Sequence, residues 1–509
     1  MNKKSKSIFL TAIAAISLIC TFGCKKDADI DGFNSYNLHD VTGLVVVNGS
    51  SLKKKPGDNW LSIDIKNREA LVEDAAEQEQ EPSVSSEYGY IEHTVPFIPT
   101  ELPVAGGVEA REAVDSREER AAKTVKPTKY VLGEPHTFSD SDPQFIGKAR
   151  NGVMTYEGEH CYIWTFKDEP NDSKMSDDEI KAFAEAFDKI YLKETALCGE
   201  TFKGDVASGL YNVITPDEKV SLVLYDIGSD LGRGVFYGYF SPSMYYTNQS
   251  GENAMEAIFV DSYFAKQEKI FPALISTVAH EFNHLLNYVQ KSLKYGFACE
   301  SWYTEMLSMI TEDFLMEDLK IDLSNSPQSR LIAFVNKGYN CGFKNWHFND
   351  SLTQYSYGNA YAFGAFLARN YGGATLIQEI ATNEFVNEES VVDAVNKING
   401  TNLSFDDLIK LFTAILYNID NDNSALPSLN KDWSGKITGK DGLEYDFSLT
   451  KIHPSCFEEI VKEPIVIKFN DVNKLSDAEL DSYGFLAFKF DGKTDLKLRL
   501  KDFLFYTYY

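Results

Sequence analysis

The chain has 509 residues, of which 76 are acidic and 49 are basic, so its formal charge at neutral pH is −27. Such an acidic protein repels polyanions, which argues against nucleic acid or an anionic lipid surface as its partner. The length predicts about two to four domains, and beyond the N-terminal residues no stretch has the length and apolarity of a transmembrane helix.

The first 24 residues have the features of a secretory signal peptide. Three lysines precede an apolar run over residues 8–22, which is too short to span a membrane comfortably. The run ends at Gly23 and Cys24, in a sequence that resembles a relaxed bacterial lipobox, where the cysteine carries the lipid. We therefore expect a protein of the bacterial cell envelope, periplasmic or at the cell surface, anchored to a membrane through lipidated Cys24. Plain secretion with a free Cys24 is the alternative.

Residues 25–130 predict a β-rich accessory region with charged linkers. Segments 43–49 and 60–65 have the composition of strands. An acidic run at 69–87 and a second charged stretch at 109–126 could be helical, but linkers or exposed tethers fit at least as well. We find no chemistry in this region and expect it to lift the rest of the protein from the membrane.

Residues 131–430 form the region that we expect to be catalytic. Segments with the composition of strands are 160–166, 220–226 and 257–264. Between the first two, residues 176–193 carry apolar side chains at helical spacing. Ser176 and Glu179 form a plausible capping box, which predicts that this helix begins near Ser176.

The centre of this region is an H-E-x-x-H pattern at residues 280–284, within a predicted helix at about 272–291. One helical turn separates His280 from His284, so both imidazoles lie about 6 Å apart on one face and can reach one cation. Glu281 lies about 100° further round the helix, where it is better placed to contact a water molecule than to bind the metal. A solvated surface pair of histidines is the alternative interpretation.

A second predicted helix, at about 299–318, offers a third ligand. Glu305 falls at the edge of an apolar stripe, 21 residues after His284. A buried carboxylate is costly unless it is paired, and pairing with a metal is one way to offset the cost. The spacing is close to that of thermolysin-like zinc peptidases, whereas a carboxylate whose head reaches water is the alternative. Asn283 or Glu312, one heptad after Glu305, could orient the ligands.

The remainder of the chain is predicted to be helical from 320 to 430 and then β-rich from 440 to 509. The predicted C-terminal strands are 464–469, 485–490 and 496–500, which alternate apolar and polar residues. Five cysteines beyond the signal peptide leave at least one thiol unpaired, and the sequence fixes no pairing. These cysteines are Cys161, Cys198, Cys299, Cys341 and Cys456.

Several segments in order resemble the hyicolysin-type family of zinc metallopeptidases, over roughly residues 150–380. They are YIWTF at 162–166, FDKIY at 187–191, VSLVLYDIG at 220–228, GYFSPS at 238–243, AIFVDSYF at 257–264, STVAHEFNHLLNY at 276–288, SWYTEMLSMITED at 301–313 and YGNAYAFGAFLARNYGG at 357–373. One departure is Thr304 and Met306 around Glu305, where such families usually have Asn and Gly. Substrate preference therefore does not carry over.

The resemblance implies an α+β fold with a thermolysin-like zincin catalytic domain. This domain would contain a mixed sheet, helices and a helical C-terminal subdomain, flanked by small β-rich domains. In zincins generally, the edge strand of the sheet pairs with extended substrate, but the sequence does not show which strand is the edge. Aromatic side chains between residues 237 and 246 could line such a cleft, although packing is the favoured interpretation.

The resemblance also implies a zinc-dependent endopeptidase that hydrolyses internal peptide bonds of proteins or peptides. One catalytic Zn²⁺ would be held by His280, His284 and Glu305, and it would activate water and polarise the scissile carbonyl. Glu281 would take a proton from that water and pass it to the leaving amine. A surface adhesin or ligand-binding lipoprotein with a structural, non-catalytic zinc site is the alternative, and the presence of Glu281 favours the enzyme.

Family position suggests Tyr357 as the donor that stabilises the oxyanion. The other candidates for this role are Tyr355, Tyr361 and His347. A packed phenol with no part in the chemistry is an equally good interpretation of Tyr357.

Overall fold

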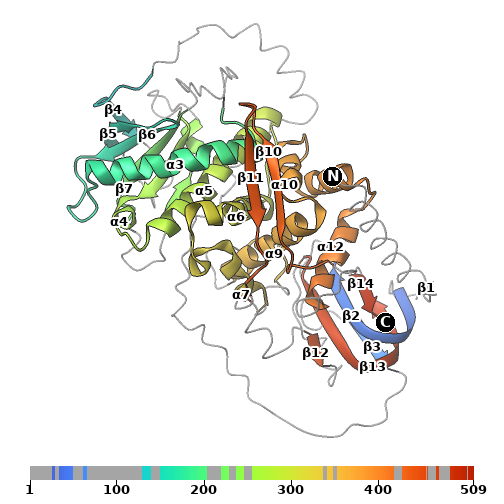
Figure 1. The fold of residues 1–509 in the computed structure, drawn as a ribbon. Coiled ribbons are helices and arrows are strands. Elements are labelled where there is room, and N and C mark those ends of the chain that lie inside the picture. The colour runs from blue at the N-terminus through green and yellow to red at the C-terminus, as the bar shows by residue number, and fades with distance from the viewer. Residues whose placement is uncertain are drawn as a thin grey trace.

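Figure 1 shows the computed structural model of the chain. It describes residues 26–28, 34–49, 61–65, 129–138, 149–202, 219–228, 237–245, 255–335, 341–347, 352–417, 427–453, 456, 466–468, 482–500 and 503–508. The predicted signal peptide with Cys24, and the charged stretches at 69–87 and 109–126, lie outside the described residues.

The sheet of the predicted catalytic region has six strands in the order β4-β5-β6-β7-β9-β8. Their bounds are β4 Pro135–Phe138, β5 Arg150–Glu157, β6 Cys161–Phe166, β7 Val220–Tyr225, β8 Gly238–Phe240 and β9 Ala257–Asp261. β6, β7 and β9 are parallel, whereas β4, β5 and β8 are antiparallel to their neighbours. The sheet is therefore mixed, and the short strand β8 forms the edge beside β9.

Both faces of the central strands are buried, as β6 illustrates. Tyr162, Trp164 and Phe166 lie in an aromatic cluster on one face. Cys161 and Ile163 point to the other face and belong to the core shared with the helices. Because successive side chains of a strand point to opposite faces, a strand buried on both sides is apolar throughout rather than alternating.

Helices pack against the second face and continue into a helical half of the molecule (Figure 1). Their bounds are α3 Asp177–Cys198, α5 Phe271–Asn287, α6 Ser301–Leu319, α9 Thr353–Tyr371, α10 Gly373–Thr382, α11 Asn387–Asn399 and α12 Phe405–Thr413. Shorter helices are α4 Ser262–Ala265, α7 Leu331–Ala333 and the 3-10 turns Pro242–Tyr245, Leu323–Asn325, Pro327–Arg330 and Ala414–Tyr417. The fold is thus a mixed α+β arrangement, in agreement with the predicted class.

The predicted capping box is confirmed at the start of α3. The Ser176 hydroxyl accepts a hydrogen bond from the backbone N–H of Glu179, and the Glu179 carboxylate accepts one from the backbone N–H of Ser176. Two backbone donors that a helix start leaves open are thereby satisfied. The helix runs to Cys198, five residues beyond the predicted end.

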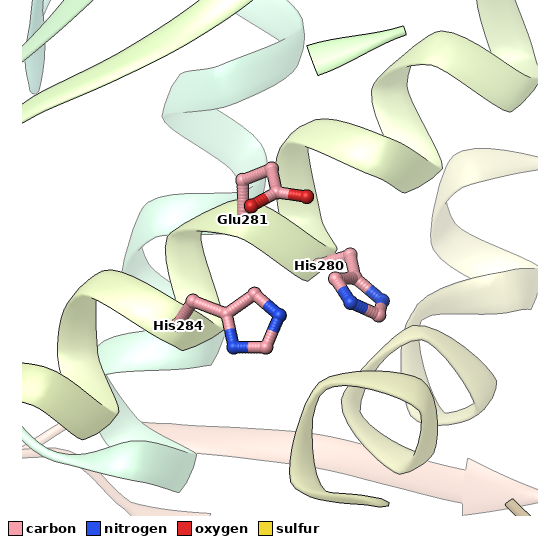
Figure 2. Close-up of side chains that lie close together, drawn as sticks. All are labelled: His280, Glu281 and His284. Atoms are coloured by element: carbon pink, nitrogen blue, oxygen red, sulfur yellow. The ribbon is translucent and has the colours of Figure 1, made fainter. Parts of the chain in front are cut away.

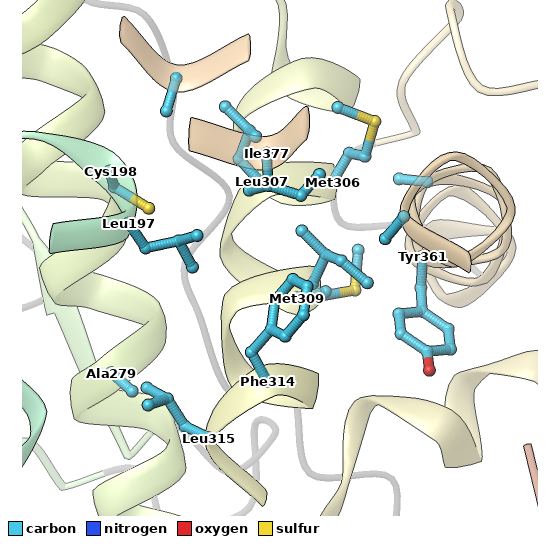
Figure 3. Close-up of a cluster of buried hydrophobic side chains, with 14 of the residues drawn as sticks. Leu197, Cys198, Ala279, Met306, Leu307, Met309, Phe314, Leu315, Tyr361 and Ile377 are labelled. Carbon is cyan, nitrogen blue, oxygen red and sulfur yellow. The ribbon is translucent and has the colours of Figure 1, made fainter. Parts of the chain in front are cut away.

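The core around α6 joins four other helices (Figure 3). Buried side chains drawn there include Leu197 and Cys198 of α3, Ala279 of α5, Met306, Leu307, Met309, Phe314 and Leu315 of α6, Tyr361 of α9 and Ile377 of α10. Helix α6 is buried on every side along Ser301–Leu315. It therefore lies at the centre of the helical half and has no solvent face over this length.

The two helices predicted around the H-E-x-x-H pattern are present with small changes. α5 spans Phe271–Asn287 and passes directly into a π-helical turn at Tyr288–Leu293, where the sequence predicted one continuous helix to about 291. α6 spans Ser301–Leu319, close to the predicted 299–318. A π-helical turn widens the backbone by one residue and is often found next to functional sites.

The predicted strand at 257–264 is too long. β9 ends at Asp261, whose carboxylate accepts hydrogen bonds from the backbone N–H groups of Tyr263 and Phe264. These bonds cap the short helix α4, which begins at Ser262. An Asp that accepts from amides two and three residues later stops a strand and starts a helix.

Strands from the two ends of the chain form one sheet. β2 (Asn34–Asn48) pairs with β13 (Phe485–Leu500) and β14 (Phe503–Tyr508), while β1 (Lys26–Ala28), β3 (Leu61–Ile65) and β12 (Val466–Lys468) complete it. The sequence placed these strands in two separate β-rich regions, 25–130 and 440–509. The structure instead joins them, and Val45, Val47, Phe485 and Ala487 extend the helical core.

A two-stranded hairpin, β10 (Trp433–Thr438) with β11 (Glu444–Leu449), crosses the boundary predicted between 430 and 440. Phe314 of α6 contacts Trp433 and Phe447 of this hairpin with ring centroids 5.8 and 5.7 Å apart. The hairpin therefore packs on the helical half. The five cysteines from Cys161 to Cys456 are all free thiols. Among the residues that the structure describes, no helix is both long and apolar enough to cross a membrane.

Candidate active site

Helix α5 presents its three motif residues inside the protein rather than at a solvated surface. His280, Glu281 and His284 are no more than 3% exposed. The apolar side of the helix packs toward α3, where Phe282 lies against Phe187 and Tyr191. The two imidazoles leave the opposite side, with ring centroids 4.8 Å apart, while the Glu281 carboxylate leaves at a different angle (Figure 2).

The His280 imidazole lies between two carboxylates of α6. Its Nε2 is 2.9 Å from Glu305 Oε2, and its Nδ1 is 2.7 Å from Glu312 Oε1. The other oxygen of Glu312 accepts a hydrogen bond from the Ser276 hydroxyl at 2.6 Å. Because a carboxylate can only accept, His280 Nδ1 donates a hydrogen to Glu312, and this bond turns Nε2 toward Glu305.

Glu305 reaches the second imidazole as well. Its Oε1 lies 3.5 Å from His284 Nε2, so one carboxylate faces the Nε2 atoms of both histidines. Glu305 is fully buried, and Oε1 has no hydrogen bond among the described residues. The Nε2 atoms of His280 and His284 on α5 and the carboxylate of Glu305 on α6 therefore converge on one point.

The charges of this cluster are strongly coupled. Burial alone would lower the pKa of His280, but its hydrogen bonds to Glu305 and Glu312 outweigh burial and raise that pKa to about 10. Burial would raise the pKa of Glu305, but the two histidines outweigh it and lower that pKa to about 2. Burial lowers the pKa of His284, which favours its neutral form. Glu305 is thus ionised and faces two imidazoles.

Glu281 is held by the edge strand of the sheet. Its Oε2 accepts a hydrogen bond from the backbone N–H of Phe240 in β8 at 2.8 Å. Its Oε1 has no partner among the described residues. Burial raises the pKa of Glu281 well above its usual range, while the nearby His280 opposes this shift. One oxygen is therefore fixed, and the other remains able to accept a proton.

The donor set fits a zinc ion. Nitrogen of His280 and His284 and a carboxylate oxygen of Glu281 lie within 4.8 Å of one another. Glu305 is the better third ligand, because both of its oxygens face the imidazole Nε2 atoms, whereas one oxygen of Glu281 is bonded to β8. Two His and one carboxylate form a common catalytic zinc set. Buried carboxylate oxygens without hydrogen bonds support the presence of a cation at this place.

Comparison with known proteins identifies the family. The family model described as Peptidase M30 matches residues 147–430, which is more than half of the chain. The chain belongs to the Peptidase M30 family. The match covers strands β5 to β9 of the mixed sheet, both motif helices and the helices up to α12, and it confirms the resemblance that the sequence suggested.

One similar protein is the neutral metalloprotease ShpI of Staphylococcus hyicus. The present chain is 25% identical to ShpI over 279 residues, which cover 52% of the chain and 58% of ShpI. The chain thus spans little more than half the length of this relative.

Two solved structures of M1 zinc metallopeptidases are also similar, but only weakly. One, from Deinococcus radiodurans, has a TM-score of 0.28 at 10% identity and covers 55% of this chain and 51% of that one. The other, a two-domain form bound to L-arginine, has a TM-score of 0.27 at 11% identity and covers 52% and 49%. At these TM-scores the likeness adds nothing to the assignment of the fold.

The candidate oxyanion donors lie on or near helix α9. Tyr357 is buried, its ring is 4.9 Å from that of Trp346, and the Arg330 guanidinium lies 4.6 Å above it. Tyr361 donates its hydroxyl to Asp313 at 2.8 Å, which commits it to another network. Tyr355 and His347 are half-buried. The role of Tyr357 stays a prediction.

The aromatic residues before β9 are packing residues where the structure describes them. Tyr237, Tyr239, Phe240 and Tyr245 are all buried. Tyr239 stacks on Phe259 with ring centroids 4.7 Å apart. This agrees with the interpretation that favoured packing over a substrate cleft.

Three polar groups at the site were not foreseen from the sequence. Ser308 contacts His284 Nδ1 at 3.3 Å, the Phe240 amide holds Glu281, and Glu194 of α3 is a fully buried carboxyl close to the cluster. Only Ser308 left a usable signal, because it follows Glu305 by three residues and therefore shares its face of α6. Phe240 acts through its backbone, which sequence does not reveal.

Proposed function

We propose that the protein is a zinc-dependent endopeptidase that hydrolyses internal peptide bonds of proteins. The observation that supports this most is the position of Glu305, whose two oxygens face the Nε2 atoms of His280 and His284, while beside them one oxygen of Glu281 has no hydrogen bond among the described residues. Family membership and the similarity to a neutral metalloprotease support the same class of reaction.

His280, His284 and Glu305 would hold the ion, which when bound would polarise the scissile carbonyl and acidify a water molecule. Glu281 would accept the proton of the attacking water on its free oxygen and deliver it to the leaving amine. The Phe240 amide fixes the second oxygen of Glu281 at 2.8 Å, which keeps the free one in a constant direction. Burial raises the pKa of Glu281, and a base that holds its proton longer can also act as the acid.

The edge strand β8 is the element on which we propose that substrate lies. It pairs with β9 on one side, where Tyr239 opposes Phe259. The backbone N–H of Phe240 points to the opposite side, because it reaches Glu281. An extended peptide that pairs with this side of β8 would pass directly beside Glu281. This arrangement is also the basis on which we propose a thermolysin-like catalytic domain.

Tyr357 is our proposed donor to the oxyanion. Of the tyrosines considered, Tyr361 is excluded by its hydrogen bond to Asp313. The Arg330 guanidinium above the Tyr357 ring would make the phenol a stronger donor by withdrawing charge from it. Replacing Tyr357 by Phe is expected to lower kcat with little change in zinc content.

A second function remains open because the cluster is deeply buried. The five side chains His280, Glu281, His284, Glu305 and Glu312 are at most 3% exposed. Burial of this kind is also expected of a structural zinc site in a binding lipoprotein. A structural site usually has four protein ligands, and here the fourth position would be filled by Glu281, one of whose carboxylate oxygens lies within 4.8 Å of a ring nitrogen of each histidine.

The two functions predict different results in one experiment. The purified protein is analysed for zinc, and its cleavage of unfolded casein and of a peptide library is followed by mass spectrometry, with and without a chelator. The endopeptidase proposal predicts about one zinc per chain and cleavage that is lost with the chelator and restored by Zn²⁺. Stoichiometric zinc without cleavage of any peptide would support the structural site.

We also propose that lipidated Cys24 anchors the enzyme to a membrane of the cell envelope, where proteins or peptides outside the cytoplasm are its substrates. The basis is the apolar run that ends at Gly23 and Cys24. Mass spectrometry of the N-terminal peptide from the native host would detect a diacylglycerol on Cys24. A free thiol at Cys24 in the membrane fraction, or an intact peptide that continues through residues 8–22, would refute the anchor.

A further inference from the structure

His284 differs from His280 in the partner of its second ring nitrogen. His280 Nδ1 contacts a carboxylate, that of Glu312, whereas His284 Nδ1 contacts the hydroxyl of Ser308 at 3.3 Å. Ser308 Oγ in turn donates a hydrogen bond to Asn283 Oδ1 at 3.1 Å. All of these side chains are at most 3% exposed, so bulk water does not compete for these bonds.

The orientation of the Asn283 amide is set by its other end. Its Nδ2 donates to Cys198 Sγ at 3.0 Å and to Thr311 Oγ1 at 3.1 Å. The two hydrogens of the amide nitrogen are therefore used by α3 and α6. This leaves the amide oxygen, which can only accept, pointing at Ser308.

The hydrogens in this series of hydrogen bonds can be assigned one by one. A serine hydroxyl has one hydrogen to donate and lone pairs with which to accept. Since its hydrogen goes to Asn283 Oδ1, Ser308 Oγ can only accept from His284. His284 Nδ1 must then carry the hydrogen of the neutral imidazole. Its Nε2 keeps a lone pair, and this is the atom that faces Glu305 Oε1 at 3.5 Å.

We propose that Ser308 and Asn283 are positioning residues that hold His284 in the tautomer whose Nε2 can bind zinc. The proposal rests on the zinc site of the proposed function and adds the residues that set its affinity. Asn283 acts only through Ser308. A hydroxyl can either donate to His284 Nδ1 or accept from it, and the fixed acceptor Asn283 Oδ1 takes the hydroxyl hydrogen, so that Ser308 Oγ accepts. Glu312 needs no such helper at His280, since a carboxylate beside Nδ1 can only accept.

We call the hydrogen-bonded series Asn283–Ser308–His284 the relay. A double-mutant cycle tests whether Asn283 acts on His284 through Ser308. Ser308→Ala, Asn283→Ala and the double variant are compared with the parent by competition for Zn²⁺ with a coloured chelator. Loss of an outer partner of a metal-binding histidine typically weakens metal binding about 10- to 100-fold. Asn283→Ala is expected to weaken zinc binding even with Ser308 intact, because the freed hydroxyl can turn and donate to Nδ1, which moves the hydrogen to Nε2.

The double variant decides the issue. If Asn283 acts through Ser308, the double variant binds zinc no more weakly than Ser308→Ala alone, so the two losses do not add. Losses that multiply to their full product would show two independent effects and overturn the relay. Ser390→Ala is the matched control, because this buried hydroxyl bonds to Ile380 O, Asn383 Oδ1 and Tyr303 OH and to neither histidine. A comparable loss in that variant would mean that any buried cavity weakens the site, and this would overturn the proposal too.

The tautomer can be measured without any variant. Nitrogen-15 NMR of the full-length protein, stripped of metal and held at a pH where His284 is neutral, distinguishes a hydrogen on Nδ1 from one on Nε2. The relay predicts Nδ1–H for His284 in the parent and a shift to Nε2–H in Asn283→Ala. Nε2–H in the parent would refute it. This measurement needs neither zinc nor hydrolysis, so a parent that binds no zinc would refute the proposed function while the relay is still decided by the tautomer.

Discussion

Helix α6 buries two neighbouring carboxylates, Glu312 and Asp313, that contact different helices and serve different purposes. Glu312 turns toward α5, with Glu305 and Ser308, and these three residues form what we call the metal face. Asp313 turns toward α9 and forms the second face. It accepts hydrogen bonds from Tyr361 and Arg369 at 2.8 Å each and from Gln328 at 3.1 Å.

The two faces differ in how their charges are balanced. On the Asp313 face, the carboxylate is paired with the fully buried guanidinium of Arg369, so the negative charge is neutralised by the chain itself. On the metal face, Glu305 faces two imidazoles and Glu312 faces one, and Glu305 Oε1 has no hydrogen bond among the described residues. The first arrangement contributes to the stability of the fold, and the second is suited to a cation from outside the chain.

Glu281→Gln is expected to have the largest effect and to separate activity from stability. The amide keeps the size of the side chain but cannot take up a proton, and loss of a general base typically costs about 100- to 10,000-fold in rate. Zinc content and the midpoint of urea unfolding should stay close to those of the parent, since the proposed ligands are unchanged and the oxygen of Gln can still accept the bond from the Phe240 amide. Rates are measured on a cleaved peptide, and zinc by atomic absorption.

Parent-like turnover by Glu281→Gln would remove Glu281 from the chemistry. Loss of zinc together with turnover would instead indicate that Glu281 is a ligand, as its position within 4.8 Å of both imidazoles would allow.

Asp313→Asn tests the other face. Removing one partner of a buried ion pair costs about 3 to 5 kcal/mol in the free energy of unfolding, because the guanidinium of Arg369 is left uncompensated. The zinc dissociation constant and the rate per folded molecule should hardly change. Urea unfolding followed by circular dichroism measures the first, and activity corrected for the folded fraction measures the second.

A surface pair provides the control for Asp313→Asn. Lys397 is 62% exposed and pairs with Glu379, so Lys397→Ala should change the free energy of unfolding by less than about 1 kcal/mol. A fall in zinc affinity in Asp313→Asn would show that the two faces of α6 are coupled rather than separate.

The metal face could be foreseen only in part from the sequence. The positions of α5 and α6 follow from the helical spacing of their apolar residues. The convergence of Glu305 on the histidines is expected only from the likeness of its spacing to that of thermolysin-like zinc peptidases. The heptad spacing predicted that Glu312 shares the face of Glu305, but the sequence did not show that the next residue, Asp313, pairs with Arg369 of α9. A helix that is buried all round carries no solvated face from which the orientation of its polar residues can be inferred.

The terminal sheet shows the limit of sequence reasoning more clearly. Alternating apolar residues predicted strands at 43–49, 485–490 and 496–500, and the structure has strands there. The pairing of Val47 with Phe485 joins residues more than 400 positions apart. Nothing local encodes that choice, since alternation fixes which face of a strand is apolar but not which strand lies beside it. The two predicted β-rich regions therefore became one sheet.

Glu312→Gln has a smaller expected effect than the first two changes, and it acts on the metal face alone. The amide can present its nitrogen to His280 Nδ1 and so destabilise the tautomer whose Nε2 faces Glu305. Zinc binding should weaken about 10- to 100-fold. The dissociation constant is measured by chelator competition.

Glu317→Gln is the matched control for Glu312→Gln, since Glu317 is exposed further along α6 and bonds only to the Ser448 hydroxyl among its described contacts. Its zinc affinity should equal that of the parent. Unchanged affinity in Glu312→Gln would mean that the carboxylate has no share in holding His280.

The smallest effect is expected at Glu194, where a substitution should change how the free energy of unfolding depends on pH. This carboxyl of α3 is fully buried, neither oxygen has a hydrogen bond among the described residues, and burial together with the negative charge of Glu312 raises its pKa well above the usual range. The folded state therefore keeps a proton that the unfolded state loses above about pH 4.5, so stability falls as pH rises from there toward the folded pKa, by at most about 1.4 kcal/mol per pH unit.

Glu194→Gln removes this ionisation, so the variant should gain stability relative to the parent as pH rises from 5 to 8. Urea unfolding of the metal-free protein at several pH values measures the difference, and Glu185→Gln, at an exposed position of the same helix, should show none. A constant difference across this range would mean that Glu194 is ionised in the folded state. A further negative charge would then lie beside the metal face, and the site would favour a cation more strongly.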